Sequence, residues 1–222
     1  MVWALIDPSG LGDYFPSGEH LGWREALEAF FQEQMTDEDR ERYSGRLTSY
    51  IYQVSRKFRE DLGLLEPHEM PREFLAATPH KSLSSLIVTE GGLHAVDETL
   101  KDLIEGLEPG VHQFWPMRIL MPGGKDYPTP YYGMVIRQFF DSFRPEQSVE
   151  GSWVGDPSYY MAFGATKAHM KGLAFDKGVF GSAHLWRETR MRQPQVLMSD
   201  ALQGAIEQAG LRIWRHFKAK EV

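Results

Sequence analysis

Eight histidines and 31 acidic residues are the side chains of this sequence that could bind a metal ion or transfer protons. His94 and Asp97 lie three residues apart, which would put them on one side of a helix. Two ligands do not make a zinc site, because zinc takes three or four protein ligands. The sequence has no cysteine and no His-Glu-x-x-His segment, and its other histidines are scattered. We therefore predict neither a metal site nor a cofactor.

Two glycine-rich segments come close to catalytic motifs without matching them. Gly123-Gly124-Lys125 lacks the earlier glycine of a phosphate-binding loop, and Asp126 replaces the hydroxyl residue that would hold magnesium. The segment from Gly151 to Gly155 has its serine in second place, whereas a nucleophile elbow has it in third. No spacing distinguishes one pair of carboxylates as an acid and a base. We therefore predict no catalytic residue.

Aromatic residues make up 13% of the chain, and one group of them lies around a predicted turn. Trp153 precedes the turn from Gly155 to Ser158, and two tyrosines follow it. Tryptophan and tyrosine beside an acid are typical anchors of protein interfaces. We predict a partner interface here; the alternative is a loop that Trp153 folds back onto the core. The predicted interface residues are Trp153, Asp156, Tyr159 and Tyr160.

The composition favours a globular protein that binds neither membranes nor nucleic acid. Hydrophobic residues make up 42% and charged residues 25% of the chain, and its net charge is −7. Negative charge disfavours contact with phosphates and suits a basic protein partner. No apolar run approaches the roughly 18 residues of a membrane span. The first eight residues lack the basic end and long apolar segment of a secretion signal, so we expect a soluble cytoplasmic protein.

The residues before 71 predict one strand and two helices. Val2–Ile6 reads as a strand, and the apolar spacing after Trp23 predicts an amphipathic helix. Thr36 can cap a second helix, whose first turn carries the acids Asp37–Asp39. The apolar stripe of that helix continues to Phe58.

A strand followed by a capped helix is predicted twice in the rest of the chain. Leu86–Val88 and a cap at Thr89-Glu90 precede a helix with an apolar stripe from Leu93 to Leu107. Val196–Met198 and a cap at Ser199-Asp200 precede one that ends at Gly210. The two copies are offset by 110 residues at the strands and by 100 at the closing glycines, so the first helix would be about ten residues longer. Either a duplication or two independent units would explain this pattern.

The predicted fold class is α+β. N-terminal helices precede a mixed or antiparallel sheet, with two strand–helix–strand units packed on it. Residues 111–120 read as extended, and Pro116 argues against a central position for that end. We predict an N-terminal strand and helical region at 1–70 and an α+β domain at 71–222, joined as one continuous globular unit.

Several segments resemble the immunity protein eleven family of bacterial polymorphic toxin systems. Leu103–Pro116, with its Glu-Pro-Gly-Val-His core, carries most of the resemblance, which covers about residues 70–217. The motifs hold no catalytic residue that could be transferred. The other similar stretches are Pro71–Leu75, Leu86–Thr89, Asp141–Phe143, Gln147–Ser148, His184–Arg187, Val196–Leu202, Ala209–Leu211 and Phe217.

The resemblance implies a non-enzymatic immunity protein. Such a protein binds a cognate toxin or effector, delivered by a polymorphic or type VI secretion system, and neutralises it by steric occlusion. The partner would be a protein toxin, and the net charge of −7 favours a basic face on it. Two alternatives remain: an enzyme, either a hydrolase or a modifier, that reverses toxin damage, and an effector-loading adaptor that binds without inhibiting. The sequence does not indicate the oligomeric state.

Overall fold

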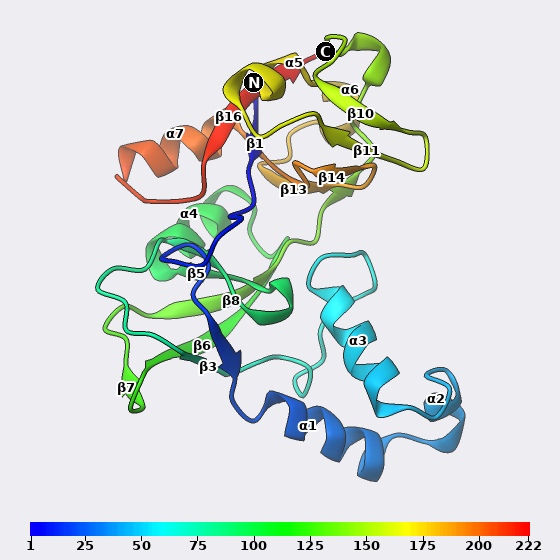
Figure 1. Cartoon of the computed structure of the whole chain (residues 1–222), viewed down its shortest axis with the longest axis vertical. Coiled ribbons are helices and arrows are strands. Elements are labelled where there is room, and N and C mark those ends of the chain that lie inside the picture. The colour runs from blue at the N-terminus through cyan, green and yellow to red at the C-terminus, as the bar shows by residue number, and fades with distance from the viewer. The chain divides into compact units, whose positions relative to one another are not determined.

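The computed structural model describes all 222 residues, which form two compact units (Figure 1). Unit 1 comprises Met1–Ser9, Asp102–His112 and Ile136–Val222; unit 2 comprises Gly10–Lys101 and Gln113–Val135. Neither unit is a continuous stretch of chain. The helices and strands together form an α+β fold, which confirms the predicted class. The predicted division of the chain into residues 1–70 and 71–222 stays a prediction.

Unit 2 is built on a mixed sheet with the strand order β2-β3-β6-β8-β5-β4, and β7 pairs with β6. β6 lies between two neighbours, although Pro116 argued against a central place. The proline is accommodated because β3 pairs with β6 only from Arg118 onward, so no bond to β3 is lost. The strands are β2 Gly18–His20, β3 Glu73–Ala76, β4 Leu86–Val88, β5 His94–Asp97, β6 Gln113–Met121, β7 Lys125–Asp126 and β8 Tyr131–Val135.

Helices fill the chain between β2 and β3. The predicted cap at Thr36 is confirmed, since its hydroxyl accepts a hydrogen bond from the Asp39 amide at 3.1 Å. The prediction of a single helix to Phe58 is wrong. Ser44 and Gly45 adopt positive φ angles of 54° and 64° and divide it. The helical segments are α1 Trp23–Ala29, the π-helix η1 Phe30–Gln34, α2 Asp37–Glu41 and α3 Leu47–Lys57.

The helix predicted from Leu93 begins five residues later. A short 3-10 turn, η2 (Glu90–Gly92), leads into β5, which is hydrogen-bonded to β4 on one side and β8 on the other. α4 then runs over Glu98–Leu107, and the Asp97 carboxylate accepts a hydrogen bond from the Leu100 amide at 2.8 Å. β5 is buried on both faces, so Leu93 and Val96 are both apolar and continue the helical spacing of the residues that follow. Periodicity therefore misplaced this boundary.

Unit 1 contains a sheet with the order β12-β16-β1-β15-β13-β9 and a second, three-stranded sheet β10-β11-β14. The predicted strands at Val2 and Val196 are confirmed, and so is the Ser199 cap, whose hydroxyl accepts from the Leu202 amide at 3.1 Å. The strands are β1 Val2–Leu5, β9 Phe139–Phe140, β10 Trp153–Asp156, β11 Tyr159–Ala162, β12 Ala174–Phe175, β13 Leu185–Glu188, β14 Met191–Gln193, β15 Val196–Ser199 and β16 His216–Glu221. The helices are η3 Pro145–Gln147, α5 Lys167–Gly172, α6 Lys177–Phe180 and α7 Asp200–Gln208.

The same five-stranded arrangement occurs in both units. In unit 2 the order is β3-β6-β8-β5-β4, with β3 parallel to β6 and the other neighbours antiparallel. In unit 1, β12-β16-β1-β15-β13 has the same order and the same directions. Helix α4 connects β5 to β6, and α7 connects β15 to β16. The strand from the N-terminus, β1, thus takes the place that β8 has in unit 2.

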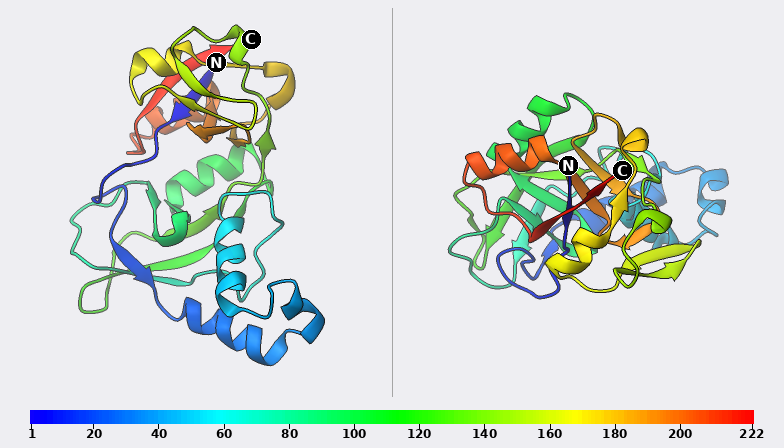
Figure 2. Two further views of the ribbon diagram at one scale, coloured as in Figure 1. Left: turned by 45° about the vertical axis from the view of Figure 1, so that its right-hand side comes forward. Right: turned by 90° about the horizontal axis from the view of Figure 1, so that it is seen from above.

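This correspondence favours duplication, but it aligns the two copies differently from the sequence prediction. Strand β5, and not β4, corresponds to β15, so the capping residues Asp97 and Ser199 are equivalent at an offset of 102. The helices that follow have ten and nine residues, so the expected difference of ten residues is wrong. The two ends of the chain lie next to each other in unit 1 (Figure 2). The amino group of Met1 lies 2.7 Å from the Glu221 carboxylate.

Candidate partner interface

The aromatic segment predicted as an interface forms a β-hairpin. β10 and β11 pair antiparallel, with Gly155 opposite Tyr160 and Asp156 opposite Tyr159. Side chains of directly opposed residues lie on the same face of a sheet, and successive residues alternate. Trp153 and Tyr160 therefore lie on one face of the hairpin, and Asp156 and Tyr159 on the other. The hairpin separates the four predicted residues into two pairs.

The inner face of the hairpin packs on an aromatic cluster. Tyr160 is only 5% exposed, and its ring centroid lies 5.2 Å from those of both Trp153 and Phe143. The Phe143 ring in turn lies 5.8 Å from that of Phe175 in β12. These edge-on and tilted contacts are favourable for aromatic rings. Trp153, which is half-buried, thus joins the hairpin to the core of unit 1.

The outer face of the hairpin presents apolar side chains to solvent. We define this outer face by its four residues, Val154, Asp156, Tyr159 and Met161. Val154 is 41% and Tyr159 39% exposed, and Phe163, just after β11, is 65% exposed. The Arg192 guanidinium lies 4.5 Å from the centroid of the Tyr159 ring, a cation–π contact.

Asp156 shapes the tip of the hairpin. Its carboxylate accepts hydrogen bonds from both the amide and the hydroxyl of Ser158. These bonds favour the charged form and lower the pKa of the Asp156 carboxyl. The tip therefore carries a fixed negative charge at neutral pH.

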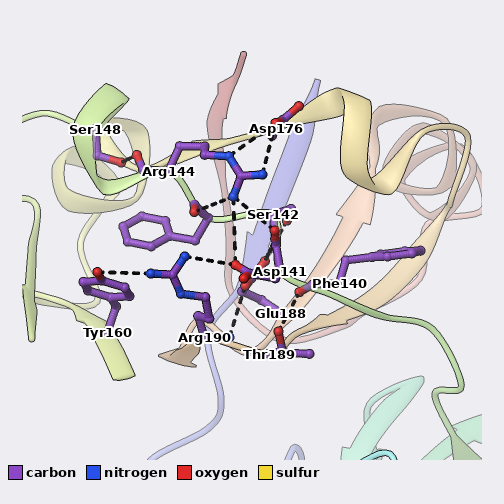
Figure 3. Close-up of polar contacts among 11 residues, drawn as sticks. Phe140, Asp141, Ser142, Arg144, Ser148, Tyr160, Asp176, Glu188, Thr189 and Arg190 are labelled. Atoms are coloured by element: carbon purple, nitrogen blue, oxygen red, sulfur yellow. Dashed lines mark hydrogen bonds and ion pairs between the residues drawn. The ribbon is translucent and has the colours of Figure 1, made fainter. Parts of the chain in front are cut away.

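A chain of charged groups borders the hairpin (Figure 3). The guanidinium of Arg190 donates to the Tyr160 hydroxyl at 3.2 Å and to the Asp141 carboxylate at 3.3 Å. On the other side of Asp141, the Arg144 guanidinium lies 3.9 Å from the same carboxylate and 3.1 Å from that of Asp176. The network runs from the hairpin across the segment that follows β9 to the residue that follows β12.

Beneath this network lies a carboxyl group that is fully buried. Glu188, at the end of β13, accepts hydrogen bonds from the amide and hydroxyl of Ser142 at 2.9 and 2.6 Å, and from the Arg190 amide at 3.2 Å. Burial raises the pKa of the Glu188 carboxyl, although these hydrogen bonds act in the opposite direction. Glu188 thereby connects the segment after β9 to the turn that begins β14.

The Glu-Pro-Gly-Val-His segment forms a second buried polar cluster in unit 1. The Glu108 carboxylate accepts from the His112 ring at 2.9 Å, the Gln138 amide group at 2.6 Å, and the backbone amides of His184 and Leu185 at 2.6 and 3.0 Å. The other nitrogen of His112 accepts from the Arg137 amide, so the ring donates to Glu108. Glu108 thus fixes the start of β13 to the segment after α4, a structural role.

A sequence profile of the Imm11 immunity protein family matches residues 39–221. The chain belongs to this family. No curated protein gives a sequence match. The match includes the Glu108 cluster and the hairpin, which supports the resemblance identified in the sequence. It begins after β1, although β1 completes the sheet of unit 1.

In this Imm11 protein, the segments with possible chemistry have other roles. His94 and Asp97 are the first and last residues of β5, and Asp97 also caps α4, so the two do not share a helix face. Lys125 follows the turn between β6 and β7, and the Ser152 hydroxyl donates to the Val149 carbonyl. No group of three or more histidine and acidic side chains could hold a metal ion. None of the helices could span a bilayer, being too short or too polar.

A cavity of about 460 Å³ in unit 2 brings a histidine near carboxylates. Its lining includes His20, Trp23 and Glu90. The His20 ring forms hydrogen bonds with the Glu90 backbone carbonyl at 3.3 Å and the Thr89 hydroxyl at 3.2 Å, and neither of these partners is a carboxylate. Burial lowers the pKa of His20 to about 4, which makes the ring a weak base.

The position of Val154 and Met161 on the outer face was not predicted from the sequence. Alternation along β11 could have indicated it, because Tyr159 and Met161 share a face that excludes Tyr160. No local pattern indicated the contact between Arg190 and Asp141, since 49 residues separate them.

Proposed function

We propose that this Imm11 protein neutralises a cognate bacterial toxin by direct binding, which blocks the toxin sterically. Membership of an immunity protein family, over residues 39–221, is the observation that carries this proposal. Inhibition by occlusion needs a rigid surface and no bond-breaking group. The polymorphic or type VI secretion context, and action in the cytoplasm of the producing cell, are parts of the same proposal.

The outer face of the hairpin is the surface that we propose contacts the toxin. It combines exposed apolar side chains with Asp156 and, from β14, Arg192. Interfaces typically centre on aromatic anchors such as Tyr159, surrounded by polar groups. Of the four residues predicted from the sequence, Asp156 and Tyr159 would touch the partner. Trp153 and Tyr160 would support the hairpin from its inner face.

The charge of the chain favours a toxin with a basic face. A net charge of −7 attracts a basic partner over distances of about a Debye length, roughly 8 Å at physiological salt. Such attraction raises the rate of association more than the final affinity. Association with the toxin should therefore slow as salt concentration rises.

The proposal is tested by co-expression with the toxin encoded beside this gene, titrating the amount of the immunity protein. Protection that requires equimolar protein supports inhibition by binding. Protection by trace amounts would instead indicate an enzyme that reverses damage, and binding without protection would indicate an adaptor. Either of those two outcomes contradicts the proposal.

The interface is tested by substituting Tyr159→Ala in the purified protein. We expect binding of the toxin to weaken by about tenfold, the scale of an aromatic anchor, with little change in thermal stability. The matched control is Val179→Ala on α6, another partly exposed apolar residue of unit 1. Equal affinities of the two variants would contradict the placement of the interface on the hairpin.

A further inference from the structure

We infer that Arg190 is the positioning residue of the proposed interface: it holds the hairpin in the orientation that binds the partner, without touching the partner itself. The inference rests on the proposed function for its binding consequence. Its structural half can be tested in the free protein.

Arg190 contacts both sides of the junction between the hairpin and the rest of unit 1. Its backbone carbonyl accepts from the Tyr160 amide at 2.8 Å, and its amide donates to Glu188. Its guanidinium binds the Tyr160 hydroxyl and the Asp141 carboxylate, and lies 5.0 Å from the centroid of the Tyr160 ring. One residue therefore fixes both the backbone and the side chain of Tyr160. Figure 3 shows its contact with the side chain.

The groups that hold Arg190 are themselves fixed. Asp141 precedes Ser142, whose amide and hydroxyl are bound by the buried Glu188. The Arg144 guanidinium donates to the carbonyls of Asp141 and Phe143, both at 3.1 Å, as well as to Asp176. The Asp141 carboxylate thus extends from a backbone segment that hydrogen bonds restrain at several points.

The hairpin needs such a restraint because its own sheet is small. β11 pairs with β14 at only two positions, and the register shifts between Tyr160 and Met161. A two-stranded hairpin is marginally stable by itself, so it depends on its contacts with the rest of the protein. Tyr159 and Met161 are the chain neighbours of Tyr160, and their side chains point to the opposite face. A rotation of the β11 backbone at Tyr160 would therefore move both outer-face side chains. Holding Tyr160 therefore preorganises the outer face.

The network should act on local order more than on global stability. The Arg190 side chain is 30% and that of Asp141 55% exposed, so water screens their ion pair. Exposed ion pairs contribute little to unfolding free energy. The hairpin packs on the core of unit 1 through one face only, and such an element can open locally while the central strands stay closed. Loss of Arg190 should therefore loosen the hairpin selectively.

The test is amide hydrogen exchange in the full-length free protein, comparing Arg190→Gln and Arg190→Lys with Lys171→Gln. Lys171, an exposed residue of α5, controls for loss of one positive charge. In Arg190→Gln we expect amides of β10 and β11 to exchange about fivefold faster or more, with β1 and β15 unchanged. Arg190→Lys should be intermediate, since lysine keeps the charge but not the forked geometry. Unchanged hairpin exchange, or equal acceleration in β15, would overturn the inference.

Binding of the toxin domain encoded beside the gene supplies the second readout. We expect Arg190→Gln to weaken affinity by about threefold to tenfold, since the hairpin must then be ordered on binding. A loosened hairpin with unchanged affinity would overturn the role of Arg190 in positioning. Failure of Tyr159→Ala to affect binding would contradict the proposed interface itself, so the two failures are distinguishable.

Discussion

At the scale of single residues, buried carboxyl groups hold together segments that are distant in sequence. Glu108 and His184 are 76 residues apart, and Glu188 and Ser142 are 46 apart. The sequence indicated that Glu108 belongs to a family motif, but no local pattern could place its carboxylate against the amides that begin β13. Spacing rules describe neighbours on one element, whereas these contacts arise only when the sheet has formed.

Replacing Glu108 by glutamine should destabilise the protein by about 2–4 kcal/mol. The carboxylate accepts from four donors, and the amide group of glutamine would place donors against some of them. Urea titration measures the loss, with Glu150→Gln, an exposed residue, as the control. A difference below about 0.5 kcal/mol between the two variants would contradict the structural role of Glu108.

The same carboxylate should make stability depend on acid pH. Burial opposes ionisation of Glu108, but hydrogen bonds from His112, His184 and Gln138 outweigh it and lower the pKa of Glu108. A lowered pKa means that its stabilisation is present above the unfolded value of about 4.3 and is lost as pH falls through the folded pKa. Unfolding free energy should fall below about pH 4.3. In Glu108→Gln that part of the pH dependence should disappear. If unfolding free energy plotted against pH ran parallel for the variant and the unsubstituted protein, the assignment to Glu108 would be wrong.

His20 should also make the unfolding free energy depend on pH, in a range above that of Glu108. Burial is the main cause that lowers the pKa of His20 from 6.5 to about 4 in the folded protein. The unfolded chain therefore binds a proton first, and stability falls as pH decreases from 6.5 to about 4. The shift corresponds to about 3 kcal/mol over that interval. Denaturant titrations of His20→Gln should show a flatter profile between these two pH values, whereas an unchanged slope would contradict the assignment.

At the scale of elements, two of the three helix caps predicted from the sequence are confirmed. Thr36 and Ser199 were identified as caps from residue type and the charge that follows, and both accept from an amide three residues on. The cap predicted at Thr89-Glu90 is wrong, because β5 intervenes and Asp97 caps α4 instead. The break after α2 was missed because the apolar stripe continues past it, and only the positive φ angles at Ser44 and Gly45 reveal the turn. For the candidate interface, the alternation of side chains along β11 was the one feature that the sequence could have revealed. The hydrogen bonds around Arg190 join segments that are distant in the sequence, so they were not predictable.

The caps of α4 and α7 should contribute equally if these helices are equivalent. Asp97 and Ser199 each accept a hydrogen bond from the third amide of the helix that follows. Substitution of either by alanine should lower unfolding free energy by about 0.5–2 kcal/mol. Thermal or urea unfolding of Asp97→Ala and Ser199→Ala measures this. A large effect at one cap and none at the other would weaken the equivalence of the two segments.

At the scale of the whole molecule, the recurring strand order suggests how the chain can be reconnected. β16 and β1 are antiparallel neighbours that occupy the places of β6 and β8, but the link between them is missing. The Met1 amino group is in contact with Glu221, so a short glycine-serine linker can join the chain ends. Opening the chain between Gly123 and Gly124 would then give unit 2 the arrangement that unit 1 has now.

We expect this circular permutant to keep the fold, with an unfolding temperature lowered by only a few degrees. Gly123 and Gly124 lie in an exposed turn, where chain breaks are tolerated. The control keeps the same linker but opens the chain between Ile104 and Glu105, inside the crossover helix α4, and should fail to fold. Circular dichroism and amide exchange in β6 and β8 measure the outcome. Loss of protection in both strands of the first permutant would show that β8 requires its covalent link to β6, and that β1 is not its counterpart.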